Sequence, residues 1–382
     1  MDTSSLPVRS GSGLRLVDGP AAAPRQGRDL GRILPARVCP ERWPAVDRRA
    51  PAPVPMVREG LSGPRGANRR SGGTFPTEED HVSGSVRPLQ GRTAVVTGAA
   101  RGLGAAMARE LARRGATVAL LGREESTLAD VRGTIPGPAR CWEVDVTDDD
   151  AMRRVAADVR DRLGPASVVV ANAGVAEGGP FAESDPVLWR RVIEVNLVGS
   201  AGTARVFLAD LRACRGYFLQ IASLASIGAS PLMSAYCASK AGVESFAHSL
   251  RAEVAHEGID VGIAYLNWTD TDMIRDADDH PVLRELRAHM PRPARKVYPV
   301  ETVAARLVRA VERRSAAVYA PSWLRATQAV RAAMPPVVTF VSKRELPRLQ
   351  RKTAFEATGL LGAGGRADTD GGHRTSAGRP DR

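Results

Sequence analysis

The chain has 382 residues, of which 43% are hydrophobic and 25% are charged, so it can bury a sizeable core. Its uncharged stretches are short and broken by Gly, Ser or Pro, which excludes a polytopic membrane protein. The net charge of +12 is spread along the chain, aromatic content is 4%, and no helix-turn-helix or zinc-finger spacing occurs, so we do not expect nucleic-acid binding.

Residues 1–88 contain 12 Pro and 11 Gly and few aromatic residues. Such a composition cannot bury enough apolar surface to offset the entropy of ordering it, which predicts a disordered extension. Whether translation starts at Met1 or at Met56 stays open. The four cysteines are scattered, so we expect reduced thiols in a cytoplasmic protein rather than a disulfide scaffold. The histidines follow no ligand pattern, and we expect no metal.

From Gly91 onward, short β-branched runs alternate with amphipathic stretches. The runs predict strands at Thr93 to Thr97, Thr117 to Leu121, Cys141 to Val146, Ser167 to Ala171, Tyr217 to Ala222, Ile259 to Tyr265 and Ala317 to Ala320. The amphipathic stretches predict helices at Leu103 to Arg114, Asp148 to Leu163, Pro186 to Cys214, Ser234 to Glu257 and Val300 to Arg314. This alternation predicts an α/β catalytic domain over residues 89–321, a single Rossmann-like doubly wound parallel sheet of about seven strands flanked by helices.

The first predicted strand runs into a glycine-rich turn, Thr97-Gly98-Ala99-Ala100-Arg101-Gly102-Leu103-Gly104, at which the helix begins. Glycines there permit a tight turn and let backbone N–H groups approach a pyrophosphate at the positive end of the helix. A plain strand-to-helix turn would look similar, but the order of strand, turn and helix favours a dinucleotide site.

The second predicted strand ends in Gly122-Arg123, where a carboxylate would bind a ribose 2′-hydroxyl. We interpret the sequence as offering no carboxylate there. Arg123 and Arg101 can both point toward a 2′-phosphate and make charge-assisted contacts with it. The alternative is two solvated arginines in an arginine-rich chain. We therefore favour NADP(H) over NAD(H).

Ser223 ends the predicted fifth strand, and Tyr236-Cys237-Ala238-Ser239-Lys240 opens the following helix. Tyr236 and Lys240 are four residues apart, so they lie on the same helix face. A neighbouring ammonium and a positively charged nicotinamide favour a phenolate, so we expect the pKa of Tyr236 to move down toward the operating pH. Ser226 is a rival to Ser223 as hydrogen-bond donor, less favoured because of its spacing to Tyr236.

These motifs, with Ala171-Asn172-Ala173-Gly174, resemble those of the short-chain dehydrogenase/reductase superfamily, and the resemblance spans roughly Gly91 to Pro321. It implies Tyr236 as general acid/base, Ser223 as a hydrogen bond to the substrate oxygen, Lys240 on the nicotinamide ribose, and Asn196 as anchor of a proton-relay water. It further implies cofactor contacts from Gly98, Arg101, Gly102, Leu103, Gly104, Arg123, Asp145, Val146, Asn172, Ala173, Gly174, Tyr236, Lys240, Thr269 and Thr271.

One segment departs from the family pattern. The family has Pro-Gly after the sixth strand, whereas this chain has Leu266-Asn267 followed by Trp268-Thr269-Asp270-Thr271. We expect Asn267 to tolerate a positive φ in place of the glycine. The residues near the predicted cleft imply a mostly apolar substrate pocket; they are Leu224, Ala225, Ile227, Leu232, Met233, Trp268, Met273 and Ile274.

The expected function is therefore an NADP(H)-dependent oxidoreductase that interconverts a ketone or aldehyde and an alcohol on an apolar small molecule. The alternatives are a non-catalytic dinucleotide sensor or scaffold, and a nucleic-acid-associated protein that uses its basic amino-terminal arm. The resemblance also implies a homodimer or homotetramer assembled through residues 186–214 and 234–257.

Residues 322–350 form a partly apolar appendage. It can lie on a membrane surface, but packing across the body or a partner subunit is favoured. Residues 351–382 are dominated by Gly, Asp, Thr and Arg, which predicts a disordered tail.

Overall fold

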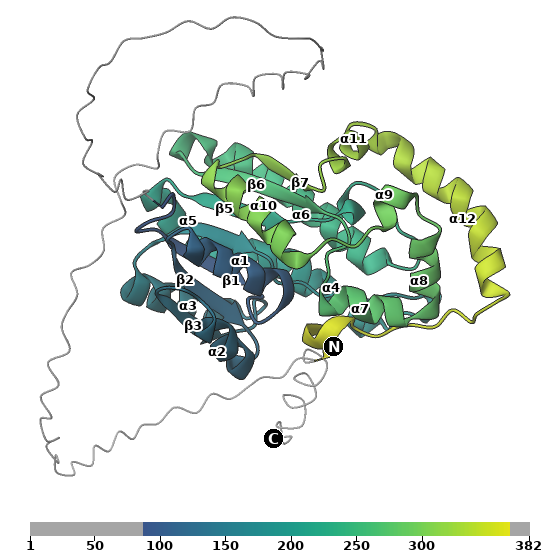
Figure 1. Ribbon diagram of the computed structural model, residues 1–382, viewed down its shortest axis with the longest axis horizontal. Coiled ribbons are helices and arrows are strands. Elements are labelled where there is room, and N and C mark those ends of the chain that lie inside the picture. The colour runs from purple at the N-terminus through teal and green to yellow at the C-terminus, as the bar shows by residue number, and fades with distance from the viewer. Residues whose placement is uncertain (1–86, 367–382) are drawn as a thin grey trace, which may run out of the picture. The chain divides into compact units, whose positions relative to one another are not determined.

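The computed structural model describes residues 87–366 (Figure 1). Within that range one sheet of seven parallel strands has the order β3-β2-β1-β4-β5-β6-β7. The strands are β1 (Thr93–Thr97), β2 (Thr117–Gly122), β3 (Ala139–Glu143), β4 (Ala166–Ala171), β5 (Tyr217–Ile221), β6 (Asp260–Leu266) and β7 (Ala317–Ala320). The predicted doubly wound fold is confirmed. The predicted extension lies almost wholly outside the described residues.

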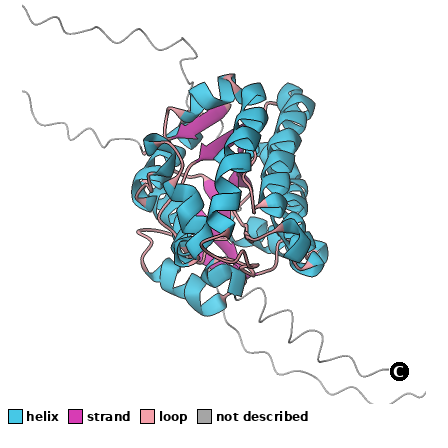
Figure 2. Ribbon diagram, turned by 90° about the vertical axis from the view of Figure 1, so that its right-hand side faces the viewer, coloured by secondary structure: helices cyan, strands magenta, loops and turns pink. Residues whose placement is uncertain are grey.

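Helices cover both faces of the sheet, as Figure 2 shows in a view turned by 90°. Side chains alternate along each strand, so Val96 packs on one face of β1 and Val95 on the other. One face packs against α1 (Gly102–Arg113), α2 (Glu125–Gly133) and α10 (Val300–Glu312). The other packs against α3 (Asp149–Leu163), α4 (Pro186–Ile193), α5 (Gly199–Cys214) and α6 (Ser234–Val254).

Several predicted elements differ from the structure by one to three residues at their ends, and α2 was not predicted; two differences concern more than an end. β3 begins two residues before the prediction and is only partly buried, because it is an edge strand with one neighbour. The predicted helix from Pro186 to Cys214 contains a π-helical turn at Glu194–Val198 between α4 and α5. Its length and composition would allow a membrane span, but half of its apolar window is buried, and α5 packs against β4 as a core helix.

The carboxyl-terminal third adds helices that the hydrophobic periodicity did not predict. They are α7 (Asp272–Asp279), α8 (Pro281–Ala288), α9 (Arg292–Arg295), α11 (Leu324–Ala329) and α12 (Met334–Gln350). Met334, at the start of α12, lies against Gly228, while Phe340 on the same helix is 75% exposed. Beyond α12, residues 351–366 of the expected disordered tail belong to the described part of the chain, and they turn back toward α7 (Figure 1).

The thiols differ from one another in state. Cys141 and Cys237 are free, as expected. Cys214 is disulfide-bonded, so the expectation of a fully reduced set is wrong at that position.

Candidate active site

A cleft of about 260 Å³ lies at the carboxyl ends of the strands. Between β1 and β4 the strand order reverses, which leaves a crevice at this edge of a doubly wound sheet. All fifteen residues expected to bind the cofactor line this cleft, and so does Ser223. Asn196 does not line it and lies behind its wall.

The glycine-rich turn is shaped by three close approaches. Gly98 has φ +63°, and a Cβ at Gly98 would lie 2.8 Å from the Cα of Ala173. A Cβ at Gly104 would lie 2.1 Å from the carbonyl oxygen of Gly98. Gly102 has φ +51° and faces Thr271 across the cleft. Side chains are excluded at these positions, so backbone N–H groups can approach a ligand at the start of α1.

Hydrogen bonds clamp this turn to the end of β4. The Thr97 hydroxyl accepts from the backbone N–H of Asn172 (3.0 Å) and of Ala173 (3.1 Å). In return, the Asn172 amide donates to the carbonyl oxygens of Thr97 (3.0 Å) and Gly98 (3.2 Å). The Ala-Asn-Ala-Gly motif thus fixes the cradle in shape before a ligand binds.

Two arginine–carboxylate pairs lie at the ends of β2 and β3. Arg101 forms an ion pair with Glu124, and Arg123 Nε lies 3.5 Å from an oxygen of Asp145. The interpretation that no carboxylate stands at this edge is therefore wrong, because Glu124 directly follows Arg123 and lines the cleft. Arg191 also pairs with Asp145.

Asp145 is held in its charged form. Burial acts to raise the pKa of Asp145, but hydrogen bonds from Thr147 and Arg191 outweigh it and hold the pKa below its usual range. Arg191 comes from α4, and no motif in the sequence pointed to it.

Three expected catalytic side chains meet at the far end of the cleft. The Ser223 side chain lies close enough to the Tyr236 phenol to lower its pKa, and both side chains line the cleft. Lys240 Nζ lies 5.6 Å from the centroid of the Tyr236 ring and donates to the carbonyl oxygen of Ile221 at 3.2 Å. The thirteen-residue spacing between serine and tyrosine thus brings both hydroxyls to one point, with the ammonium beside them.

Burial is the main cause of the pKa shifts of Tyr236 and Lys240. It raises the pKa of Tyr236 to about 12, an effect that the lowering influence of the Ser223 side chain only partly offsets. It also lowers the pKa of Lys240 to about 8. The expectation of a lowered tyrosine pKa is therefore wrong for the protein alone, because burial outweighs the neighbouring groups.

Asn196 lies in the π-helical turn and is 1% exposed. Its side-chain oxygen accepts from the N–H of Val175 (2.8 Å), and its amide donates to the Val175 carbonyl (2.9 Å) and to the Ser239 hydroxyl (2.9 Å). Ser239 in turn donates to the carbonyl oxygen of Tyr236 at 2.8 Å. Asn196 therefore joins the loop after β4 to the helix that carries Tyr236. Single π-turns often occur at functional positions.

The turn that carries Ser223 is a capping box. Ser223 N–H donates to the hydroxyl of Ser226 at 3.2 Å, and the Ser223 hydroxyl accepts from the N–H of Ala225 at 3.1 Å. Ser226 is buried and does not line the cleft, so its hydroxyl shapes the turn.

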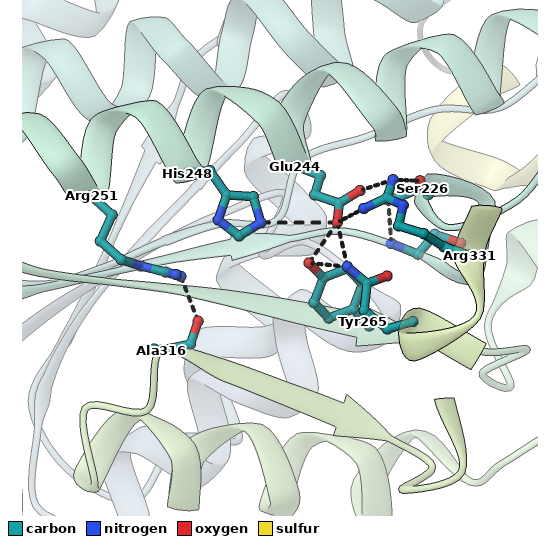
Figure 3. A network of polar contacts seen from close by, with 9 residues as sticks. Ser226, Glu244, His248, Arg251, Tyr265, Ala316 and Arg331 are labelled. Atoms are coloured by element: carbon teal, nitrogen blue, oxygen red, sulfur yellow. Dashed lines mark hydrogen bonds and ion pairs between the residues drawn. The ribbon is translucent and has the colours of Figure 1, made fainter. Parts of the chain in front are cut away.

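Near this turn, the buried carboxylate of Glu244 on α6 accepts hydrogen bonds from several side chains (Figure 3). Its oxygens accept from the Tyr265 hydroxyl (2.7 Å), the Gln328 amide (2.9 Å) and the Arg331 guanidinium (2.8 and 3.1 Å). Arg331 also donates to the carbonyl oxygen of Ser226 at 3.1 Å. The segment after β7 thereby connects α6, the helix that carries Tyr236, to the turn that carries Ser223, which no sequence motif indicated.

The Asn267 segment holds its shape differently from the expectation. Among the described residues, the non-glycine residues with positive φ are Arg215, Leu232 and Arg314, so Asn267 does not replace glycine in that way. Its buried amide instead donates to the carbonyl oxygens of Ala294 (3.0 Å) and Lys296 (3.3 Å). These bonds place the following Thr269 and Thr271 on the cleft wall.

The apolar pocket residues divide into two groups. Met273 and Ile274 line the cleft, and Met233 packs with Tyr236 beside it, whereas Ile227 is buried in the core and Leu224 packs against it. The other three expected residues do not line the cleft; they are Ala225, Leu232 and Trp268. Sequence reasoning missed a further contribution, from residues 361–365 of the predicted tail, which line the same cleft. Among residues 87–366, no group of three or more His, Cys, Asp or Glu side chains is placed to hold a metal ion.

Comparison with known proteins agrees with this geometry. Residues 92–281 match the family model of the short chain dehydrogenases. A short chain dehydrogenase of Pseudocercospora fijiensis is 33% identical over 54% of this chain and 71% of its own length. The cis-4-hydroxycyclohexanecarboxylate dehydrogenase of Sinomonas cyclohexanicum is 37% identical over 48% of this chain and 75% of its own.

A solved structure also resembles the chain. It is a provisionally named gluconate dehydrogenase from Agrobacterium tumefaciens, with a TM-score of 0.56 and 27% identity, over 61% of this chain and 96% of that one. Members of this family are oxidoreductases that use NAD(P)(H). With its cleft, its motifs and these relatives in agreement, the chain belongs to the short-chain dehydrogenase family.

Proposed function

We propose that this protein is an NADP(H)-dependent oxidoreductase that interconverts a ketone or aldehyde and an alcohol on a small, mainly apolar molecule. The observation that carries the proposal is that Ser223, Tyr236 and Lys240 line one end of a cleft whose other end is a glycine cradle, with Lys240 Nζ 5.6 Å from the centroid of the Tyr236 ring.

The cradle fits a dinucleotide. A Cβ would clash at Gly98 and at Gly104, so the turn presents backbone to the cleft. Residues 98–104 and 172–174 would hold the cofactor, and Lys240 would hold its nicotinamide ribose. When bound, the nicotinamide supplies or accepts the hydride.

Two side chains, Ser223 and Tyr236, would bind the substrate oxygen and exchange a proton with it. Ser223 and Tyr236 can both donate to that oxygen, and donors fixed in place stabilise the charge that develops on it in the transition state. A pKa near 12 keeps the Tyr236 phenol protonated at neutral pH, which suits proton donation during carbonyl reduction. In the reverse direction, the positive charge of an oxidised nicotinamide favours the phenolate that must take a proton from the alcohol.

Replacing Tyr236 tests the proposal. Tyr236→Phe should lower kcat by a hundredfold or more, a magnitude typical of general acid–base catalysis, while the Kd of NADPH stays within about threefold. The panel is cyclic and linear ketones, because one relative is named for a hydroxycyclohexane substrate. Tyr319→Phe, which alters a tyrosine on β7 outside the cleft, is the control. Near-normal turnover by Tyr236→Phe would remove this residue from the mechanism.

The preference for NADP(H) rests on Arg101 and Arg123, which line the cleft near the end of β2. A 2′-phosphate can compete with Glu124 and Asp145 for these guanidinium groups, and each charge-assisted bond contributes about 1.5–3 kcal/mol. Arg123→Asp should therefore weaken NADPH binding by about tenfold or more without weakening NADH binding, measured by fluorescence titration. Arg154→Asp, on the exposed face of α3, controls for net charge. Equal NADPH affinities in the two variants would contradict the assignment.

The proposed assembly is a homodimer or homotetramer. α4 and the π-turn expose Val187 (66%) and Val198 (54%), two apolar side chains within the helices that the family resemblance assigns to subunit contacts. Light scattering after size-exclusion chromatography should give a mass of two or four chains, and Val198→Glu should lower it.

A further inference from the structure

The chain returns to the cleft after α12. We use the name C-terminal strap for residues 356–366. Thr358 exchanges two hydrogen bonds with Gly178: the Gly178 N–H donates to the Thr358 hydroxyl (2.9 Å), and the Thr358 N–H donates to the Gly178 carbonyl (2.8 Å). Leu360 forms an antiparallel bridge with Glu177, and the Leu361 N–H donates to the Ala176 carbonyl at 2.8 Å. The strap therefore lies against the loop that follows β4.

The strap is also fixed to α7. The Gly362 N–H donates to Asp276 at 2.9 Å, and Arg366 forms an ion pair with the same carboxylate. Gly362 has φ +83°, and a Cβ there would lie 3.0 Å from the Cα of Met273. Backbone contact this close requires glycine. The strap is thus held on both the loop after β4 and α7.

Leu361 is the side chain that this arrangement places beside the catalytic group. It is 2% exposed and shares an apolar cluster with Met233, Tyr236 and Met273. It lines the same cleft as Ser223 and Lys240. Leu360, the preceding residue, packs instead into the core cluster on one face of the sheet and does not line the cleft.

We propose that the C-terminal strap is a wall of the substrate pocket and that Leu361 limits the size of the apolar carbonyl compound or alcohol that reaches Tyr236. The inference rests on the proposed function and adds a specificity-determining residue to it. Leu361, Met233 and Met273 together present an apolar surface next to the Tyr236 ring, which favours aliphatic or alicyclic groups on the substrate carbon.

The test compares two ketones that differ only in bulk, cyclohexanone and 4-tert-butylcyclohexanone, with the NADPH-loaded full chain. Leu361→Ala should raise the ratio of kcat/KM for the bulky ketone to that for the small one by about tenfold, and Leu361→Phe should lower it, because pocket volume discriminates by such factors. Leu360→Ala removes an equally buried side chain of the same strap and should leave the ratio unchanged. Equal ratios in Leu361→Ala and Leu360→Ala would overturn the proposal.

A second measurement separates this inference from the proposed function. Kd values of the same two ketones are measured by ligand-observed NMR in the Tyr236→Phe background, where turnover is not needed. If the wild type reduces neither ketone, the proposed activity on such ketones fails, but the Kd ratio still reports on the strap. A Kd ratio that shifts with Leu361→Ala and not with Leu360→Ala supports the wall, and a ratio unaffected by either variant refutes it.

Discussion

The two ends of the cleft are built in different ways. At the cofactor end, eight consecutive residues, Thr97 to Gly104, supply a cradle whose shape depends on missing side chains and on one partner motif at the end of β4. At the substrate end, the wall is assembled from loops and helices far apart in the chain, around residues 176–178, 273–276 and 358–362. The first end is specified by backbone geometry, and the second by side-chain packing and long-range contacts.

We expect the largest effect from a substitution in the glycine-rich turn at the cofactor end. Gly104→Ala places a methyl group where a Cβ would lie 2.1 Å from the Gly98 carbonyl, so the turn must shift. We expect a loss of about 3 kcal/mol in the free energy of unfolding, at the upper end of typical overpacking costs, and loss of dinucleotide binding. Calorimetry and fluorescence titration measure the two effects.

The matched control is Gly133→Ala in α2, where nothing lies within 4 Å of the added methyl group. It should leave binding unchanged and be neutral or slightly stabilising. If both alanine variants bind NADPH alike, backbone geometry does not specify the cofactor end.

Lys240 lies beside Tyr236 at the substrate end, and burying its ammonium group destabilises the folded state in a pH-dependent way. Its pKa is about 8 in the folded protein, against 10.5 for an exposed lysine, so below pH 8 the folded state holds a charge that the unfolded state accommodates better. Between pH 8 and pH 10.5 the Lys240 side chain is deprotonated in the folded state but still protonated in the unfolded state. Because the unfolded state then binds more protons, the free energy of unfolding rises with pH, and the destabilisation caused by the buried charge disappears. Lys240→Met should therefore stabilise the protein by up to about 3 kcal/mol at pH 7 and by little near pH 10.5.

Urea unfolding at several pH values measures this gain. Lys343→Met removes an exposed lysine on α12 and serves as the reference for a general change in net charge. A gain that does not shrink between pH 8 and pH 10.5 would mean that the burial of this ammonium is not what the substitution relieves.

A smaller effect tests whether the carboxyl-terminal segment supports the catalytic end. Arg331→Ala removes the contacts from the guanidinium to Glu244 and to the Ser226 carbonyl. We expect kcat to fall about tenfold, the equivalent of one charge-assisted hydrogen bond, with the Kd of NADPH within about twofold. Arg331→Lys should recover part of the rate, and Arg325→Ala on exposed α11 should have no effect. A loss confined to KM or to cofactor affinity would show that Arg331 does not position Ser223.

The sequence could predict what local chemistry dictates. The β-branched runs predict the strands, and the glycine positions predict the glycine-rich turn. The spacing from Ser223 to Tyr236 and Lys240 predicts that these side chains lie close together, and the structure shows that they do. The role of each residue in turnover stays a prediction. The carboxylate at Glu124 could have been predicted, since it directly follows Arg123 in the sequence. Its ion pair with Arg101 could not, because adjacency in the chain does not show which side chains meet.

Contacts between distant segments could not be predicted. Two partners of Glu244, Gln328 and Arg331, lie 84 and 87 residues away in the sequence, and neither carries a motif. The strap has a composition typical of disorder, yet Gly362 permits its close contact with α7, and Gly178 and Gly179 permit its close contact with the loop after β4. The raised pKa of Tyr236 was missed because burial, which depends on the whole fold, outweighs the neighbouring residue that the motif supplies.

The network around Glu244 bears on where the chain can be shortened. A chain ending at Pro321 would retain the region matched to the family model but would lack Gln328 and Arg331. The buried Glu244 carboxylate would then keep the Tyr265 hydroxyl as a hydrogen-bond donor, with His248 4.0 Å away. One ending at Leu349 would restore that pairing and still lack Leu361. A shortened chain that keeps the Glu244 network, Leu361 and the ion pair of Arg366 with Asp276 must therefore extend at least to residue 366, beyond the residues that match the family model.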